Sequence, residues 1–462
     1  MSIKLSNFRV VTPPFFDDNE GCIKRIVYAT RTSSVRIINE ASWKIIEGGI
    51  FDSLPKEMLF DFVEIKLLVP TDEDELTTIL NRNDAAAVND DNLYMVVQPT
   101  ASCQLGCHYC GQEHTSKLLS NEEQHLFIKR TRAKLEANKQ LRKLSIGWFG
   151  AEPLVGLSVM RTLTPLLMEL AESFGCSYFS KIVTNGLALT EKVATEIVND
   201  LGVQFIEITL DGVAEYHDIR RMQKNGMPTF EKIFANVVAL ARRKDLEVEL
   251  SIRCNVDRQN YQSVSSLLQM LAEEGLQERI SFYVAPIHSW GNDAHTRSLS
   301  PEEFAAWEIL WLTEMIQVGF KPALIPDQNP IVCMAVMPNA ELVDAYGTIF
   351  NCTEVSYVPT YGTPNEYAIG HLSGKEMLGS RERLGNFNDQ VRQGEYPCSS
   401  CRMLPVCGGA CPKSWQEGLE SCPSTKRNIE QRLLLSYAVS RVEQQINSSE
   451  KATIQQTTLV NV

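Results

Sequence analysis

The chain has 462 residues, of which 44% are hydrophobic, and it carries a formal net charge of −13. Length and composition predict a globular protein with a large core and one or two smaller modules. The acidic balance and the lack of a clustered basic face argue against nucleic-acid binding, because phosphate contacts require Lys and Arg. No run approaches eighteen apolar residues and the N-terminus has no signal-peptide pattern, so the sequence predicts a cytoplasmic protein without membrane contact.

The thirteen cysteines are numerous for such a protein. In a reducing compartment they are more typical of metal ligands or catalytic thiols than of structural disulfides. Three lie at 103–110 and seven between 333 and 422. The isolated Cys22, Cys176 and Cys254 are predicted to be ordinary buried thiols.

Residues 1–90 are predicted to form a separate module with no cysteine cluster. Residues 24–49 have the pattern of a β-hairpin that leads into a short helix. Residues 54–76 have the pattern of a helix and a strand before an acidic turn.

Residues 91–310 alternate short β-branched or aromatic runs with longer amphipathic segments, which predicts parallel strands joined by crossover helices. A capping box at Ser120 and Glu123 predicts the start of the first helix. The fold class is therefore α/β, with six β/α units in a partial barrel. Its six strands are predicted at 93–99, 144–150, 178–184, 204–210, 247–256 and 280–286.

The loops after these strands collect polar and glycine-bearing stretches on one predicted rim. In parallel β/α barrels the chemistry lies at the carboxyl ends of the strands. The exit loops read "ASCQLGCHYC", "GAEP", "TNG", "LDG", "RCNVD" and "APIHSW". We therefore expect one site on this rim, with Asn255, His288 and Trp290 as pocket candidates and His288 as a possible proton acceptor.

The first exit loop places Cys103, Cys107 and Cys110 at C-x3-C-x2-C spacing. Three thiolates would hold a four-iron cluster that has one iron without a protein ligand. A zinc site is the alternative, with His108 or His114 as the fourth ligand.

This loop, with the aromatic Tyr109 before its third cysteine, resembles that of the radical S-adenosylmethionine (radical SAM) superfamily. The resemblance implies a cluster whose open iron binds S-adenosylmethionine, which releases a 5'-deoxyadenosyl radical that abstracts hydrogen from a substrate. "FGAEPL" resembles the family's Gly-Gly-Glu-Pro stretch, with Ala151 in place of the second glycine. That change matters only if position 151 needs a positive φ.

The same resemblance implies further contacts to S-adenosylmethionine. Glu152 would accept hydrogen bonds from its ammonium group, and Arg220 or Arg221 in "YHDIRR" would pair with its carboxylate, unless that arginine forms only a surface ion pair. The implied cofactor-binding residues are Tyr109, Gly150, Glu152, Thr184, Asn185, Asp211, Arg220, Arg221 and Arg253.

Residues 311–430 hold the second group of cysteines. A zinc ribbon on Cys398, Cys401, Cys407 and Cys411 is one interpretation of the local spacing. The full order C-x13-G-x4-C, C-x2-C-x5-C-x3-C and a last Cys422 resembles the SPASM extension, which implies two auxiliary four-iron clusters. The outer cluster would take Cys398, Cys401, Cys407 and Cys422. The inner cluster would take Cys333, Cys352 and Cys411, and either Asp327 or no fourth ligand; the open iron is slightly favoured.

SPASM enzymes mostly act on peptides or proteins, which implies a peptide maturase that cross-links a ribosomal precursor through a C–C, thioether or ether bond. A low-potential electron donor of the flavodoxin or ferredoxin type would be a second partner. Thr353 stands where sulfatase-maturing members carry an aspartate, which argues against that activity, and Glu354 would point elsewhere if its segment is extended.

Residues 1–90 loosely resemble the winged-helix-like modules that bind precursor leaders, and a structural cap over the barrel is the alternative. A leader would add a strand to the exposed hairpin edge. Other functions remain open: a maturase of a protein subunit, a small-molecule dehydrogenase of the same superfamily, or a non-enzymatic iron–sulfur or zinc module. A helix is predicted from about 424 to 446, in a C-terminal segment at 431–462 that ends in a frayed polar tail.

Overall fold

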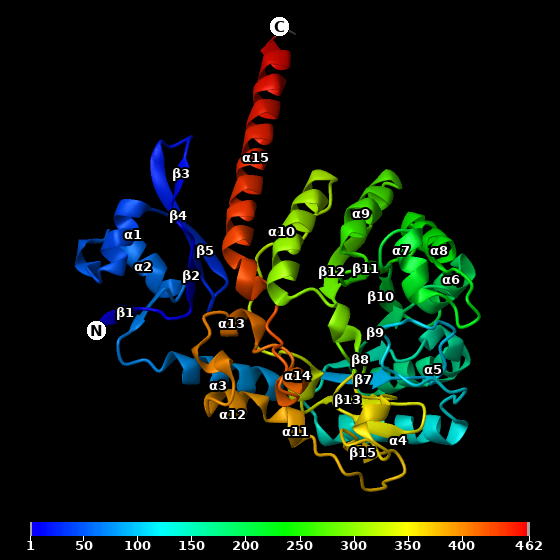
Figure 1. The fold of residues 1–462 in the computed structure, drawn as a ribbon. Coiled ribbons are helices and arrows are strands. Elements are labelled where there is room, and N and C mark those ends of the chain that lie inside the picture. Colours follow the sequence, from blue (N-terminus) through cyan, green and yellow to red (C-terminus); the bar gives the residue numbers. More distant parts are fainter. Residues whose placement is uncertain (1, 460–462) are drawn as a thin grey trace.

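The computed structural model describes the backbone of residues 2–459 and the side chains of residues 2–446. Its central feature is a nine-stranded sheet of order β12-β11-β10-β9-β8-β7-β13-β14-β15 (Figure 1). All neighbours from β7 to β12 pair in parallel. Because β7 pairs with β13 and not with β12, the barrel is open. The six parallel strands are β7 (Asn92–Val97), β8 (Lys143–Trp148), β9 (Ser177–Thr184), β10 (Val203–Thr209), β11 (Glu249–Val256) and β12 (Ile280–Pro286).

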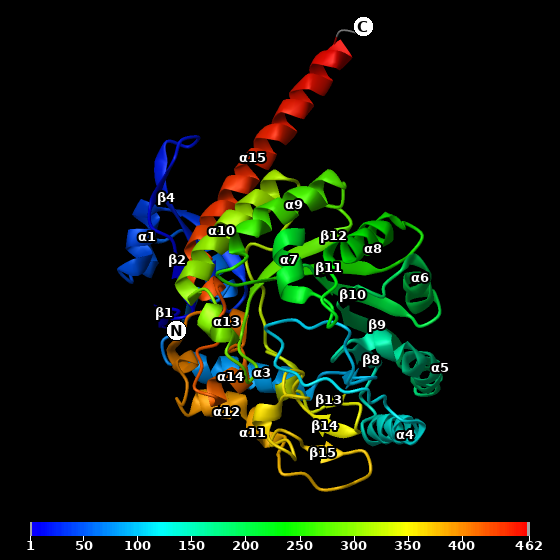
Figure 2. The ribbon, with the colours of Figure 1, turned by 45° about the vertical axis from the view of Figure 1, so that its right-hand side comes forward.

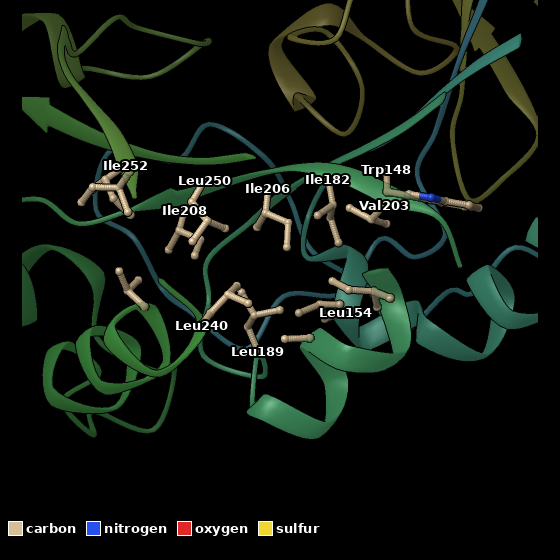
Figure 3. Packing of buried hydrophobic residues seen from close by; sticks show 14 of the residues in the cluster. Trp148, Leu154, Ile182, Leu189, Val203, Ile206, Ile208, Leu240, Leu250 and Ile252 are labelled. Atoms are coloured by element: carbon tan, nitrogen blue, oxygen red, sulfur yellow. The ribbon is translucent and has the colours of Figure 1, made fainter. Parts of the chain in front are cut away.

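Every predicted strand is confirmed with its start within two residues, and the helices cover one side of the sheet. Ser120 and Glu123 form the predicted capping box. Figure 3 shows Ile182 and Ile206 of the strands facing Leu189 across the core. Alternate strand residues therefore face the helices and the barrel interior. The helices are α4 (Asn121–Ala137), α5 (Leu157–Ser173), α6 (Glu191–Asn199), α7 (Ala214–Arg221), α8 (Phe230–Arg242), α9 (Val264–Glu273) and α10 (Pro301–Gln317).

The cysteine-rich region extends the barrel sheet at its β7 edge. β13 (Ala340–Val343) runs parallel to β7, while β14 (Thr348–Phe350) and β15 (Gly370–His371) follow in antiparallel pairing. Around them lie α11 (Glu382–Gly385), α12 (Phe387–Arg392), α13 (Leu404–Cys407) and α14 (Pro412–Gln416). The second cysteine group is thus joined to the barrel through backbone hydrogen bonds.

The N-terminal module has the predicted hairpin, helix, helix and strand in that order. β4 (Cys22–Ala29) and β5 (Ser34–Asn39) form the hairpin, followed by α1 (Glu40–Glu47), α2 (Lys56–Glu64) and β6 (Leu68–Pro70). β2 (Arg9–Val11) and β3 (Phe15–Asp17) pair with β4, and β1 (Ile3–Leu5) pairs with β6. α3 (Glu75–Val88) then packs on α12 of the cysteine-rich region.

Two predictions about single thiols and the C-terminal helix need correction. Cys176 and Cys254 are buried, but Cys22 is only half-buried at the start of β4. α15 (Thr425–Leu459) lies between the N-terminal module and α10, and it projects from the body (Figures 1 and 2). The prediction of a frayed tail is wrong for residues 447–459, where α15 continues. No Gly or Pro ends the helix there. Residues 460–462 lie outside the described residues.

One helical stretch, Pro153–Ser173, is long and apolar enough by composition to cross a membrane. Half of its most apolar window is buried inside the protein, where Leu163, Leu167 and Leu170 join the main core. The sequence has no unbroken apolar run of that length, and this stretch meets the criterion by its mean composition. The stretch contains α5, a core helix of the barrel, and its isolated polar residues hide its apolar character in a search for unbroken runs.

Glu341 of β13 is a buried carboxylate that joins the barrel to the cysteine-rich region. It accepts hydrogen bonds from Arg130 at 2.7 Å and from Arg381 at 3.0 Å, and Lys134 lies at 2.8 Å. Removal of one buried partner leaves uncompensated charge. The carboxylate therefore holds three cations at this junction.

We expect Glu341→Gln to lower the free energy of unfolding by about 2 kcal/mol, because three partly exposed cations lose their shared anion. Thermal unfolding followed by circular dichroism should show a lower midpoint. The matched control is Glu136→Gln on the exposed face of α4, which should leave the midpoint unchanged. Equal midpoints for the two variants would contradict this role for Glu341.

Candidate functional site

The loop after β7 carries Cys103, Cys107 and Cys110 and is tied to the segment after α7. Gly106 donates a backbone hydrogen bond to Met222 at 2.9 Å, and His108 donates one to Arg220 at 3.1 Å. The Cys110 N–H donates to the Cys107 carbonyl at 3.0 Å, which closes a tight turn around the third thiol. Side chain and backbone thus hold all three cysteines on one short loop.

Glu152 lies in the loop after β8 and is fully buried. Its carboxylate accepts hydrogen bonds from the Thr184 hydroxyl at 2.6 Å and from the Asn185 N–H at 2.7 Å. Burial raises the pKa of Glu152, against the effect of these hydrogen bonds. Gly150 has the positive φ of this loop, +99°, and Ala151 does not, so the glycine-to-alanine change is tolerated by the backbone.

A polar network surrounds the aromatic residue of the cysteine loop. The Tyr109 hydroxyl donates to Asp211 at 2.6 Å and accepts from Arg221 at 2.5 Å. Asn255 donates to the same hydroxyl at 3.3 Å, and its backbone N–H donates to Asp211 at 2.9 Å. Asp211 after the fourth barrel strand and Asn255 of the fifth therefore orient the Tyr109 ring of the first exit loop.

The two neighbouring arginines have different places in the structure. Arg221 lines the main cavity, whereas Arg220 is fully buried away from it, with Nη1 at 2.6 Å from Asp257 Oδ1. The Asp257 and Arg220 pair supports the backbone carbonyl that receives His108. Of the two candidates for the cofactor's carboxylate, the geometry leaves only Arg221 facing the cavity.

The main cavity has a volume of about 610 Å³ at the carboxyl ends of the barrel strands. It joins the cysteine loop, the exit loops of the other strands and the cysteine-rich region. Asp211 and Arg220 do not line it, and neither does Asp327. The predicted residues that line it are Cys103, Cys107, Tyr109, Cys110, Gly150, Glu152, Thr184, Asn185, Arg221, Arg253, Asn255, His288, Trp290 and Cys333.

His288 and Trp290 form the wall of this cavity after β12. Burial lowers the pKa of His288, with a smaller effect from the Arg253 and Lys413 cations. The imidazole is therefore neutral at pH 7 and can accept a proton. The Lys413 ammonium of the cysteine-rich region lies 4.7 Å from the centre of the Trp290 ring, which links the two regions across the cavity.

Glu354 also lines the cavity, so the prediction that it points elsewhere is wrong. That prediction assumed an extended segment. The chain from Cys352 to Tyr357 instead forms bends and turns, and Tyr357 has a positive φ of 63°. The alternation of side chains along a strand does not apply there.

Lys181 of β9 and Glu207 of β10 are cavity residues that the motif analysis missed. Both side chains face the inside of the barrel, at positions before the carboxyl ends of their strands. A strict count of alternate positions back from Thr209 would have identified Glu207.

The second cysteine group separates into two sets. Cys398, Cys401, Cys407 and Cys422 line one small second cavity, and Cys411 does not. Burial raises the pKa of Cys352, and the nearby Cys411 and Cys333 thiols raise it further. Cys333, Cys352 and Cys411 are therefore neighbours and form a second set. Asp327 is exposed, beside Tyr28.

This division does not match a zinc ribbon on Cys398, Cys401, Cys407 and Cys411. Among the residues with described side chains, no three His, Cys, Asp or Glu groups are arranged to hold a single metal ion. A four-iron cluster is wider than one ion and takes one cysteine at each iron, so four thiols around a small cavity fit it.

Comparisons with known proteins agree with this geometry. Residues 97–271 match the family model described as "Radical SAM superfamily". The chain is 23% identical over 346 residues to a cysteine-type anaerobic sulfatase-maturating enzyme of Clostridium novyi, which covers 70% of this chain and 88% of that protein. It is 25% identical over 362 residues to a serine-type enzyme of Bacteroides thetaiotaomicron, with 70% and 83% covered.

A solved structure described as native anSMEcpe with bound AdoMet and Cp18Cys peptide has a similar fold. The TM-score is 0.52 at 18% identity, and the match covers 77% of this chain and 99% of that chain. At this identity the likeness concerns the fold.

Proposed function

We propose that this chain, whose residues 97–271 match the radical SAM superfamily model, is a peptide maturase that forms an intramolecular cross-link in a ribosomally made precursor. The observation that carries the proposal is the single cavity shared by the three-cysteine loop and Cys333 of the second cysteine group. A cavity of about 610 Å³ is in the size range of small-molecule and cofactor sites.

The residues of the first loop fit S-adenosylmethionine and its cluster. Cys103, Cys107 and Cys110 would ligate three irons, and Glu152 would accept hydrogen bonds from the cofactor's ammonium group. Arg221 would pair with its carboxylate, because it presents its guanidinium to the cavity. When bound, S-adenosylmethionine and its cluster would supply a 5'-deoxyadenosyl radical. Two auxiliary clusters would supply an acceptor for the electron that bond closure releases.

The separation of the second cysteine group supports one auxiliary cluster on Cys398, Cys401, Cys407 and Cys422, and another on the other three cysteines. Only the second set reaches the main cavity, through Cys333. The exposure of Asp327 favours an inner cluster with an open iron. An external low-potential donor of the flavodoxin or ferredoxin type would supply the first electron.

Closure of the cross-link releases a proton inside the cavity. His288 is suited to accept it because burial keeps the imidazole neutral. Trp290 and Arg253 would position the substrate segment, and Asn255 would hold Tyr109 in place.

The N-terminal module supports a peptide substrate. β5 pairs with β4 alone among the described strands, so its other edge is free to bind a strand. Arg36 of β5 donates to Asp61 of α2 at 2.7 Å, which holds the helix beside that edge. Phe60 and Val63 of α2 are 75% and 38% exposed, and they offer apolar contacts to side chains of an added strand.

A second candidate is oxidation of one side chain on a protein partner. It is favoured by the Glu354 carboxylate in the cavity, close to the cysteine set of Cys352, and by the two curated relatives described above. A carboxylate at this place could remove a proton from a substrate side chain.

Mass spectrometry of short peptides encoded beside this gene, each co-expressed with the enzyme, tests the proposal. We expect one peptide to lose two hydrogens with the intact chain and none with the Cys103→Ala, Cys107→Ala, Cys110→Ala variant. A cross-link suppresses backbone fragments between the joined residues, whereas oxidation of one side chain leaves them. No mass change on any peptide would contradict a peptide maturase.

The same peptide tests the role of the N-terminal module. Phe60→Asp should slow its modification about tenfold or more at limiting peptide concentration, because apolar contact beside β5 is lost. Cleavage of S-adenosylmethionine without peptide should not change. Equal modification rates would favour a structural cap over a leader-binding module.

A further inference from the structure

The second cavity is a mostly apolar recess that contains one ammonium group. Its thiols are Cys398, Cys401, Cys407 and Cys422, and Lys426 lies on the same wall. The rest of the lining is mainly Pro397, Met403, Leu404 and Ala410. In such surroundings a charge acts more strongly on its neighbours than it does in water.

Lys426 points at a cysteine rather than at a carboxylate. Its Nζ lies 3.2 Å from Cys422 Sγ. Among the residues with described side chains, no carboxylate oxygen lies within 4.0 Å of this ammonium group. Glu420 is the nearby anion: its Oε1 accepts a hydrogen bond from Arg427 at 2.8 Å, and its carboxylate also interacts with the Cys422 thiol. The charge of Lys426 is thus directed into the cavity.

The backbone adds positive potential at the same place. α15 is 35 residues long and begins at Thr425, so its N-terminal turn follows Cys422 closely. The N-terminal end of a helix carries a partial positive charge that stabilises anions. Lys426 lies in that first turn, and the helix fixes the direction of its side chain.

The inner cysteine set lies beside a carboxylate. The charged group beside Cys352 is Glu354, whose carboxylate, after burial, raises the pKa of that thiol. Cys422 of the outer set also has a carboxylate beside it, Glu420, but it has the Lys426 ammonium group as well.

We propose that Lys426 raises the reduction potential of the outer auxiliary cluster by donating a hydrogen bond to the Cys422 thiolate. Reduction adds a negative charge to a cluster, and hydrogen bonds to its sulfurs with nearby positive charge stabilise the reduced state. This inference rests on the proposed cluster on the outer four cysteines.

The test is a redox titration of the reconstituted full chain, followed by electron paramagnetic resonance. The Cys103→Ala, Cys107→Ala, Cys110→Ala background removes the signal of the first cluster. In this background we expect Lys426→Met to lower the midpoint potential of the outer cluster and Lys426→Arg to stay close to the parent. Lys426→Gln keeps a hydrogen-bond donor without the charge, and its midpoint potential should also lie below that of the parent. This variant replaces Lys426→Met in the test if Lys426→Met fails to retain iron.

An unchanged potential in Lys426→Met or Lys426→Gln, at equal iron content, would overturn the role of Lys426 and leave the proposed function standing. A separate variant tests whether the proposed outer cluster exists. If Cys398→Ala with Cys401→Ala changes neither the iron content nor the spectrum of the same background, the outer four cysteines hold no cluster. That outcome would overturn this inference together with the proposed outer cluster.

Discussion

Cys103→Ala should abolish cleavage of S-adenosylmethionine to 5'-deoxyadenosine, measured by chromatography with dithionite as the electron source. Cys103 is one of only three thiols on the loop, and it is buried beside Asn185, whose Nδ2 lies 3.8 Å from its Sγ. A cluster with two remaining protein ligands cannot hold its place in the cavity. Iron content should fall by about four per chain, while the auxiliary irons stay bound.

The matched control is Cys254→Ala, which removes a buried thiol of β11 outside both cysteine groups. We expect this variant to keep its iron and its cleavage rate, at a cost of about 1 kcal/mol in stability. Retained cleavage in Cys103→Ala would contradict the assignment of the first loop, whatever the control shows.

Gly111→Ala should lower the cleavage rate about 100-fold, because a displacement of about 1 Å at a catalytic loop has effects of that size. A Cβ at position 111 would lie 1.8 Å from the Trp290 carbonyl oxygen. Either the turn that carries Cys110 or the wall segment with Trp290 must move. Steady-state cleavage and iron content measured together show which of the two has been disturbed: slow cleavage with lost iron indicates Cys110, and slow cleavage with intact iron indicates Trp290.

Gly106→Ala in the same loop is the control. Its added Cβ would meet the Lys224 side chain at 3.7 Å, an ordinary van der Waals contact. The variant should therefore behave like the parent. If both variants keep full activity, the close packing of the cysteine loop on Trp290 is not needed for the reaction.

The barrel strands and their exit loops could be predicted because they depend on local patterns. Runs of β-branched and aromatic residues mark β8, β9 and β10, and the burial of β9 and β10 partly alternates along the strand. The capping box at Ser120 is likewise complete within four residues. Ala151 departs from its motif, and the meaning of that change depended on which residue has the positive φ, which the structure assigns to Gly150.

Residues whose role depends on a distant partner were harder to predict. Arg220 and Arg221 are adjacent in sequence, yet Asp257 draws one into the core and Tyr109 holds the other at the cavity. Glu354 faces the cavity because of turns that no alternation rule describes. Lys426 gave no signal at all, because its importance comes from a thiol one helical turn away and from an apolar recess built by other segments.

The sequence by itself determined the α/β class, the six strands, the three-cysteine loop and the order of the second cysteine group, since spacing and periodicity are properties of neighbouring residues. The tertiary structure separated Cys411 from the other four C-terminal thiols, decided that Arg221 rather than Arg220 reaches the cavity, and brought the Lys426 ammonium group to Cys422. These outcomes depend on which segments pack together, and burial and charge at a site are summed over all of them.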